Sequence, residues 1–192
     1  MAVLRRAPPW PWAIAWLWAT LAAALLARSA GGAEAPNEYQ VKAVFVFNFS
    51  RFVEWPAAAL GAANEPFVIG IVGNDPFGAR LDEAVRGEQI NQHPLQIRRF
   101  GSIGDAANCR ILYIDRSQSA QLRDILAALA NRNVLTVADF EGAGERGVMM
   151  QFVTESNRIR LRINVEAAKA AGLTISSKLL RPAEIVSTAG RE

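Results

Sequence analysis

The chain has 192 residues, of which 51% are hydrophobic and 20% are charged, and Cys109 is its single cysteine. One cysteine excludes both an intrachain disulfide and a zinc site built on cysteine pairs. Three of the 21 Lys and Arg residues lie in the first 33 positions, which leaves 18 basic and 18 acidic residues in the rest of the chain. A net charge near zero gives no support to nucleic-acid binding, which normally requires a basic surface.

The segment 1–33 has the three-part order of a secretory signal peptide. Arg5 and Arg6 are followed by an apolar run of 15 residues at 13–27 and by small residues at 29–33. A membrane-spanning helix needs about 20 apolar residues, so the pattern favours a cleaved signal over a retained anchor. We expect cleavage before Glu34, which would release the remaining chain outside the cytoplasm as a single domain, 34–192, that is not embedded in the membrane.

The segment from Asn37 to Trp55 is predicted to form an amphipathic helix. Asn37 is a favourable N-cap residue, and Pro56 ends the helix because the residue before a proline avoids helical geometry. Apolar side chains recur at intervals of three and four residues, as they do on one face of a helix. The predicted buried stripe consists of Val41, Val44, Phe45, Asn48, Phe49, Phe52 and Val53, with Asn48 as its one polar member.

The middle of the chain alternates between short apolar strands and helices. The expected strands cover 67–72, 95–100, 110–115 and 134–137, and the expected helices cover 76–85 and 117–130. The first of these strands is apolar throughout, which is typical of a strand buried on both faces of a parallel sheet. Strands and helices that alternate at these lengths imply right-handed crossovers within one mostly parallel sheet.

The C-terminal part follows a different pattern. Strands at 148–153 and 158–163 are joined by the four-residue segment 154–157, which predicts an antiparallel hairpin. A helix over 165–171 ends at Gly172, a residue suited to a C-terminal cap. The predicted fold class is therefore α/β, with a mostly parallel sheet flanked by helices and a C-terminal antiparallel hairpin.

No group of residues typical of an enzyme or a cofactor site stands out. His93 is the one histidine, and its polar surroundings indicate an exposed turn residue rather than a catalytic base. Neither His93 nor Cys109, which we expect to be a small buried hydrophobe, lies in a cluster with metal-ligand spacing. The glycines around Gly73 depart from the spacing of a dinucleotide loop, and Asp75 would repel the pyrophosphate. The sequence predicts a protein that is not an enzyme and has no cofactor.

Two short segments contain candidate binding residues. Asn48 needs a hydrogen-bond partner if it is buried, and Arg51 and Trp55 could form a planar corner that stacks and binds an anion. The alternative is structural, with Asn48 as a polar anchor and Trp55 as a plug at the helix end. Lys178 and Arg181 lie in a run with serines and leucines that would bind an anion or a partner, or form a solvated tail.

Four motifs in chain order resemble one protein family, the YfiR/HmsC-like periplasmic proteins. The opening motif is Lys42–Pro56 (KAVFVFNFSRFVEWP), and the first strand and turn are Val68–Gly78 (VIGIVGNDPFG). The middle strand is Cys109–Ile114 (CRILYI), and the closing motif is Arg162–Arg181 (RINVEAAKAAGLTISSKLLR). Each motif is weak alone, whereas four in order across nearly the whole chain after the signal are fairly specific.

The resemblance implies a parallel-sheet α/β fold, often found as a homodimer, and a regulatory function. The best-understood members of this family are periplasmic repressors that bind the sensor domain of an inner-membrane diguanylate cyclase. They keep cyclic-di-GMP and biofilm formation low until an outer-membrane lipoprotein or envelope stress sequesters them. Some members carry disulfides that stabilise or gate the fold, and a chain with Cys109 alone forms no such intrachain pair.

A second hypothesis is a periplasmic small-molecule carrier or co-receptor. The turn at 73–76 follows a predicted strand, and ligands of open α/β sheets bind at the carboxyl ends of the strands. The two hypotheses differ in the expected partner, which is a membrane sensor in the first and a small solute in the second.

Overall fold

The computed structural model describes residues 36–101, 103–106 and 108–189. The chain divides into two units, Met1–Pro36 and Asn37–Glu192, and the first lies almost entirely outside the described residues. The expected signal peptide and its cleavage before Glu34 therefore also lie outside them and stay predictions.

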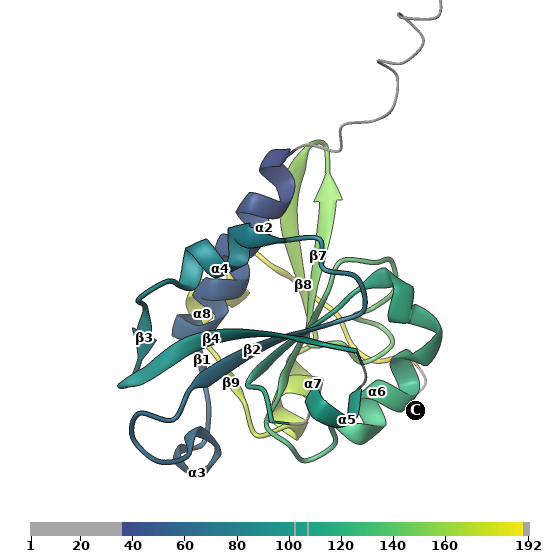
Figure 1. The fold of residues 1–192 in the computed structure, drawn as a ribbon. Coiled ribbons are helices and arrows are strands. Elements are labelled where there is room, and N and C mark those ends of the chain that lie inside the picture. The colour runs from purple at the N-terminus through teal and green to yellow at the C-terminus, as the bar shows by residue number, and fades with distance from the viewer. Residues whose placement is uncertain (1–35, 102, 107, 190–192) are drawn as a thin grey trace, which may run out of the picture. The chain divides into compact units, whose positions relative to one another are not determined.

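An eight-stranded sheet forms the centre of the second unit (Figure 1). Its strands in spatial order are β10 (Glu184–Ile185), β8 (Arg158–Ile163), β7 (Met150–Glu155), β6 (Leu135–Ala138), β5 (Ile111–Ile114), β2 (Phe67–Val72), β4 (His93–Phe100) and β3 (Gln89–Ile90). The pairs from β4 through β2, β5 and β6 to β7 are parallel, whereas β7 and β8 form an antiparallel hairpin. The predicted α/β class, with its mostly parallel sheet and C-terminal hairpin, is confirmed.

Helices cover both faces of the sheet. Alternate residues of the central strands point in opposite directions and therefore contribute to two separate core clusters. Ile69 and Ile71 of β2 belong to one core cluster, whereas Val68 and Val72 belong to the other. The first cluster includes side chains of α2 (Pro36–Phe52), α4 (Ala79–Val85), α7 (Val165–Ala170) and α8 (Ser177–Leu180). The second includes side chains of α5 (Ile103–Ala106) and α6 (Leu122–Ala128).

The first helix differs from its prediction at its end and in its buried face. α2 ends at Phe52, and the next two residues form β1 (Val53–Glu54), which pairs with β9 (Thr174–Ile175); the short α3 (Ala57–Leu60) follows. The predicted stripe is wrong at its start, because Val41 and Val44 are 38% and 46% exposed. The fully buried apolar residues of α2 are Ala43, Val46 and Phe49, of which only Phe49 belongs to the predicted stripe.

Local hydrogen bonds explain the shorter helices of the middle region. The Asp75 carboxylate accepts from the backbone N–H groups of Phe77 and Gly78, so that these residues form a turn and α4 begins at Ala79 instead of 76. The helix expected over 117–130 begins as a 3-10 helix, Arg116–Gln121, and continues as α6.

Two further expectations are corrected. The loop of the β7–β8 hairpin has two residues instead of four, since Glu155 pairs with Arg158 and the intervening Ser156 and Asn157 have φ of 48° and 60°. These left-handed conformations are those of a tight hairpin turn that matches strand twist. His93 lies in β4, is only 6% exposed, and its Nδ1 is 2.9 Å from the carbonyl oxygen of Glu65, so it is no exposed turn residue.

Candidate functional site

The outer face of α2 carries apolar side chains in contact with solvent. Val41, Val44, Asn48 and Arg51 are spaced by three and four residues, so they follow one another along one side of the helix. Val41 and Val44 are two of the three large hydrophobic side chains that the described part of the chain exposes. We call these four residues the α2 outer face.

The candidate residues of the α2 outer face make few contacts. Asn48 is half-buried, and its side chain takes part in none of the hydrogen bonds found among the described residues. Arg51 is exposed; its Nη2 donates to Glu88 Oε2 at 2.7 Å, and its guanidinium lies 4.6 Å from the centre of the Phe47 ring. An exposed ion pair of this kind contributes about 0–1 kcal/mol, so Arg51 can exchange Glu88 for a partner's carboxylate at small cost.

Trp55 has a structural position. Its Nε1 donates to the carbonyl oxygen of Asn133 at 3.0 Å, and its ring forms a T-shaped pair with the Phe67 ring at a centroid distance of 5.0 Å. Arg51 stacks on Phe47, so the side chains of Arg51 and Trp55 do not form the expected stacked corner. Both residues line one cleft of about 610 Å³, together with Ser50, Val53, Glu54, Leu60, Phe67, Gln89, Ile90 and Asn91.

The two cations expected near the C-terminus lie at α8, which is joined to the end of α2. The backbone N–H of Ser176 donates to the carbonyl oxygen of Phe52, and Lys178 Nζ lies 5.9 Å from the centre of the Phe52 ring. Arg181 is exposed and forms no ion pair with any described residue. The structure therefore brings Lys178 next to the C-terminal turn of α2, beside the end of the α2 outer face.

A buried charged network, which sequence reasoning missed, joins α2 to the residue that follows β6. Lys42 Nζ lies 2.8 Å from Glu38 Oε1 and 3.0 Å from Asp139 Oδ2, and Tyr39 Oη donates to the same Asp139 oxygen at 3.0 Å. The Lys42 and Asp139 side chains are 5% and 7% exposed. With Lys42 turned inward, Val41 and Val44, which lie about 100° and about 160° from it around the helix, point outward.

The electrostatics of this network follow from its burial. The hydrogen bond from Lys42 lowers the pKa of Glu38 against the opposing effect of burial, and a hydrogen bond from Thr154 lowers it further. Tyr113 lies on β5 and is affected by Asp139 of this network. Burial raises the pKa of Tyr113, and the negative charge of Asp139 raises it further. The sequence offered one signal for this network, namely a lysine four residues after Glu38 at the start of the opening motif.

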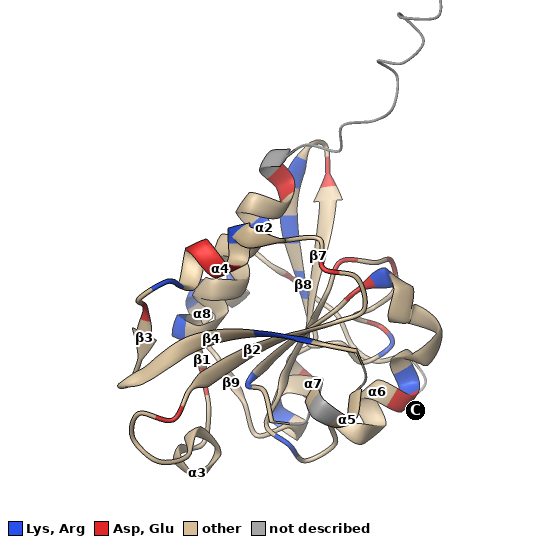
Figure 2. Cartoon of the chain, in the orientation of Figure 1, with Lys and Arg blue, Asp and Glu red and all other residues tan. Residues whose placement is uncertain are grey.

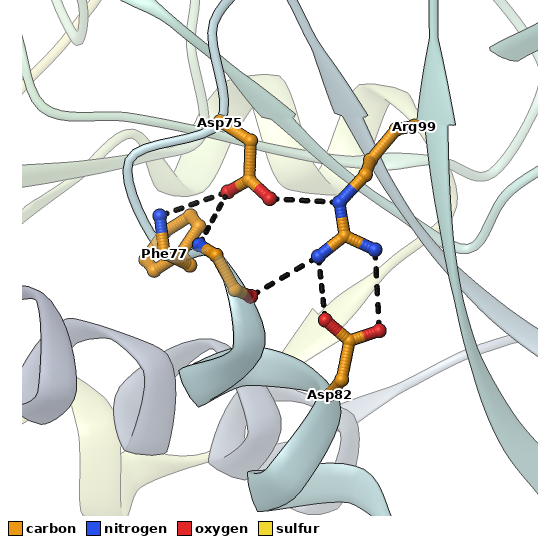
Figure 3. A network of polar contacts seen from close by, with 5 residues as sticks. Asp75, Phe77, Asp82 and Arg99 are labelled. Atoms are coloured by element: carbon orange, nitrogen blue, oxygen red, sulfur yellow. Dashed lines mark hydrogen bonds and ion pairs between the residues drawn. The ribbon is translucent and has the colours of Figure 1, made fainter.

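A second network, drawn in Figure 3, surrounds Arg99 near the end of β4. Its Nε donates to Asp75 Oδ2 at 2.7 Å, its Nη1 and Nη2 donate to the two oxygens of Asp82, and Nη2 also donates to the carbonyl oxygen of Gly78. Arg99 lowers the pKa of Asp82, mainly through this hydrogen bond. The guanidinium therefore holds both α4 and the turn before it against β4.

The loops at the carboxyl ends of β2 and β5 are in direct contact. The backbone N–H of Asn74 lies 3.3 Å from Asp115 Oδ1, which also accepts from the backbone N–H of Ser117. A Cβ on Gly73 would lie 2.7 Å from Ser117 Oγ, so even a methyl group does not fit between the loops. The two loops therefore leave no room for a side chain at position 73.

The remaining candidate chemistry is sparse. Cys109 is fully buried, its thiol donates to the carbonyl oxygen of Ala106, and burial raises the pKa of this thiol to about 12. Within the described residues no group of three or more His, Cys, Asp or Glu side chains is arranged to hold a metal ion. In the same part of the chain, no helix is long and apolar enough to cross a membrane.

The fold and its surface define an α/β domain with a doubly covered, mostly parallel sheet and an apolar, solvent-exposed helix face. A family model described as YfiR/HmsC-like matches residues 39–184, and the chain belongs to this family. Members of the family are periplasmic regulators of a non-catalytic type that act on membrane proteins, which indicates a regulatory role here. No curated protein matches the chain.

Two solved structures share the fold at low sequence identity. A conserved domain protein from Vibrio cholerae O1 biovar El Tor strain N16961 matches with a TM-score of 0.53 and 13% identity over 77% of this chain. The ABC domain from Streptococcus pneumonia in complex with L-Trp matches with a TM-score of 0.50 and 11% identity over 75% of this chain. In both cases the match covers 60% of the other protein's length, and the likeness concerns the fold alone.

Proposed function

We propose that this protein is a periplasmic repressor that binds the periplasmic sensor domain of an inner-membrane diguanylate cyclase and thereby lowers cyclic-di-GMP and biofilm formation. The observation that carries the proposal is the family match over residues 39–184. The protein would act by population shift: it binds the inactive state of the sensor more tightly and so increases the fraction of cyclase in that state. Release by an outer-membrane lipoprotein and homodimer formation are part of the same proposal.

The α2 outer face is the surface that we assign to the sensor. Val41 and Val44 offer apolar contact, and Arg51 and Lys178 supply cations at one end of that face. Arg181, directly after α8, is a third exposed cation. The centre of a protein interface is typically apolar with arginine enriched, whereas its rim is polar. This composition suits a partner segment with apolar side chains flanked by carboxylates.

The function is tested by deleting the gene and restoring it in two forms. Deletion should raise cellular cyclic-di-GMP and surface attachment, and residues 34–192 behind a foreign signal peptide should reverse both effects. The same residues without a signal should fail, because the sensor faces the periplasm. Unchanged cyclic-di-GMP in the deletion strain would overturn the proposal, and so would full rescue by the cytoplasmic form.

The assigned surface is tested with a matched pair of substitutions. Val44→Glu places a charge on the α2 outer face and should abolish repression, whereas Ile185→Glu changes an apolar residue on β10 that is even more exposed, 54% against 46%, and should not. Both variants should keep the wild-type melting midpoint, because each new charge reaches solvent. If Val44→Glu repressed as strongly as Ile185→Glu, the sensor would bind elsewhere.

A second candidate, a small-molecule carrier or co-receptor, is favoured by one observation. The cleft lined by Arg51 and Trp55 has a volume of about 610 Å³, within the range of small-ligand sites. It lies at the amino-terminal end of β2, since Phe67 is among its lining residues. A deletion strain with unchanged cyclic-di-GMP and altered uptake of a solute would favour this function.

A further inference from the structure

At both edges of the sheet a short last strand leaves part of its neighbour open. On one side β10, with two residues, pairs only with Arg162 and Ile163 of β8. On the other side β4 has eight residues, and β3 pairs with only two of them, His93 and Pro94. One more hydrogen bond, from the backbone N–H of Leu95 to the carbonyl oxygen of Glu88, extends this pairing by one residue. Among the described strands none lies on the outer side of Gln96–Phe100.

An open edge of this kind is unusual in natural proteins. The unpaired backbone groups of a regular strand can form hydrogen bonds with a strand of another chain. Proteins commonly block such edges with a bulge, a proline or a covering loop. The inner side of β4 pairs with β2 in unbroken register from Leu95 to Phe100, so it contains no bulge there. Its one proline, Pro94, lies in the part that β3 already covers.

The strand is also held firmly in place. The Arg99 network fixes its α4 side through Asp75 and Asp82. On the other side, the Phe100 ring packs against Gly70, where a Cβ would lie 2.7 Å from a ring carbon. A strand held on both sides has little conformational freedom left to lose, so an added strand would pair with it at a low entropic cost.

The charge along this edge is positive and partly uncompensated, as the blue segment of β4 in Figure 2 illustrates. Arg99 is neutralised by its two carboxylates, whereas Arg98 is exposed and its Nε donates to Gln96 Oε1 at 3.1 Å. Within the described residues no carboxylate lies within ion-pair distance of Arg98. An incoming strand with a carboxylate near Arg98 would satisfy this charge.

We propose that the outer edge of β4, Gln96–Phe100, is a docking site for an extended, acidic segment of a partner protein, which adds to the sheet as a further strand. Main-chain hydrogen bonds would supply much of the affinity, and Arg98 would select acidic sequences. A second copy of this chain fits less well, because pairing two β4 edges would bring two Arg98 side chains onto one short contact. The site is separate from the α2 outer face and does not depend on the proposed sensor.

Amide hydrogen exchange with a defined peptide tests the proposal. The purified exported protein is mixed with a blocked seven-residue peptide of alternating valine and glutamate, and a valine–lysine peptide of equal length is the control. The acidic peptide should slow exchange at Gln96–Phe100 by about tenfold or more, because new backbone hydrogen bonds protect these amides. Protection elsewhere, equal protection by the lysine peptide, or none at millimolar peptide would overturn the proposal.

The role of Arg98 is tested with matched charge reversals. Arg98→Glu should weaken binding of the acidic peptide by about tenfold or more, whereas Arg123→Glu, at a 96% exposed position on α6, should leave it unchanged. Both variants should melt at the wild-type temperature, which separates lost binding from lost folding. Equal weakening in the two variants would reduce the effect to overall charge, and protection that appears without peptide as protein concentration rises would identify a second copy as the occupant.

Discussion

The Lys42 and Arg99 networks both join a helix to the sheet through ion pairs, yet they differ in access to water. Lys42 and Asp139 are 5% and 7% exposed, whereas Arg99 and Asp82 are each 42% exposed. A buried charge that loses its partner has no water to replace it, while an exposed charge does. The network with fewer direct bonds, around Lys42, should therefore matter more for stability.

The largest effect is expected from breaking the buried network. Lys42→Ala should lower the free energy of unfolding by about 3–5 kcal/mol, because it leaves the Asp139 carboxylate buried without its cation. Urea unfolding of the purified protein measures this change. The double variant Lys42→Met with Asp139→Asn should recover part of the loss, since it removes both charges. A loss below about 1 kcal/mol for Lys42→Ala would contradict the importance of burial.

A smaller effect is expected from the exposed network. Arg99→Ala should cost about 1 kcal/mol, because once the guanidinium is gone water can solvate Asp82, and backbone N–H groups still bond Asp75, which is 17% exposed. Arg99→Lys keeps the charge but loses the paired hydrogen bonds to Asp82, so it should recover little of this loss. Urea unfolding midpoints of the three proteins decide the order. A cost equal to that of Lys42→Ala would remove the distinction between the networks.

Acid should weaken both networks, and the buried one more. Lys42 lowers the pKa of Glu38 from its ordinary value of 4.5, and Arg99 lowers the pKa of Asp82 from 3.8. Such carboxylates stabilise the fold above their unfolded pKa, and this contribution disappears as the pH falls through the lower, folded pKa. The melting temperature should therefore decrease as the pH is lowered below about 4.5. Glu38→Gln should reduce this dependence of the melting temperature on pH more than Asp82→Asn does. The reverse order would contradict the comparison.

The smallest effects are expected on the α2 outer face, where neither network reaches. Asn48→Ala and Arg51→Ala should each change the free energy of unfolding by less than about 0.5–1 kcal/mol, since Asn48 has no hydrogen-bond partner among the described residues and Arg51 pairs at the surface. Arg51→Ala should nevertheless weaken repression in the deletion strain. Equal loss of folding and repression would make Arg51 a structural residue.

Local pattern was sufficient where an element is apolar on both sides or alternates strictly. Strand 67–72 was predicted with the bounds of β2, and 158–163 with those of β8. The first is a continuous apolar run and the second alternates arginine with apolar residues, so neither depends on knowledge of its neighbours. The four motifs likewise indicated the family that the whole-chain match shows.

The rotation of α2 could not be read in this way. Five of the six residues from Ala43 to Asn48 are apolar, so several faces of the helix satisfy the same periodicity. In the fold, Lys42 lies on the inner face and meets Asp139, which is 97 residues further along the chain. Arg98 and Arg99 were equally ambiguous, because only the tertiary structure shows which of the two faces a pair of carboxylates.

The sequence by itself determined the order of the longer strands and helices, the hairpin and the family, because apolar periodicity and turn residues act over a few positions. The short elements β1, β3, β9, β10, α3, α5 and α8 were not predicted. The tertiary structure alone decided the burial of His93 against the Glu65 carbonyl, the inward turn of Lys42 and the closed loops beyond β2 and β5. Each of these depends on a partner that is distant in sequence. A polar group is buried where such a partner satisfies it, and only the folded chain brings the two together.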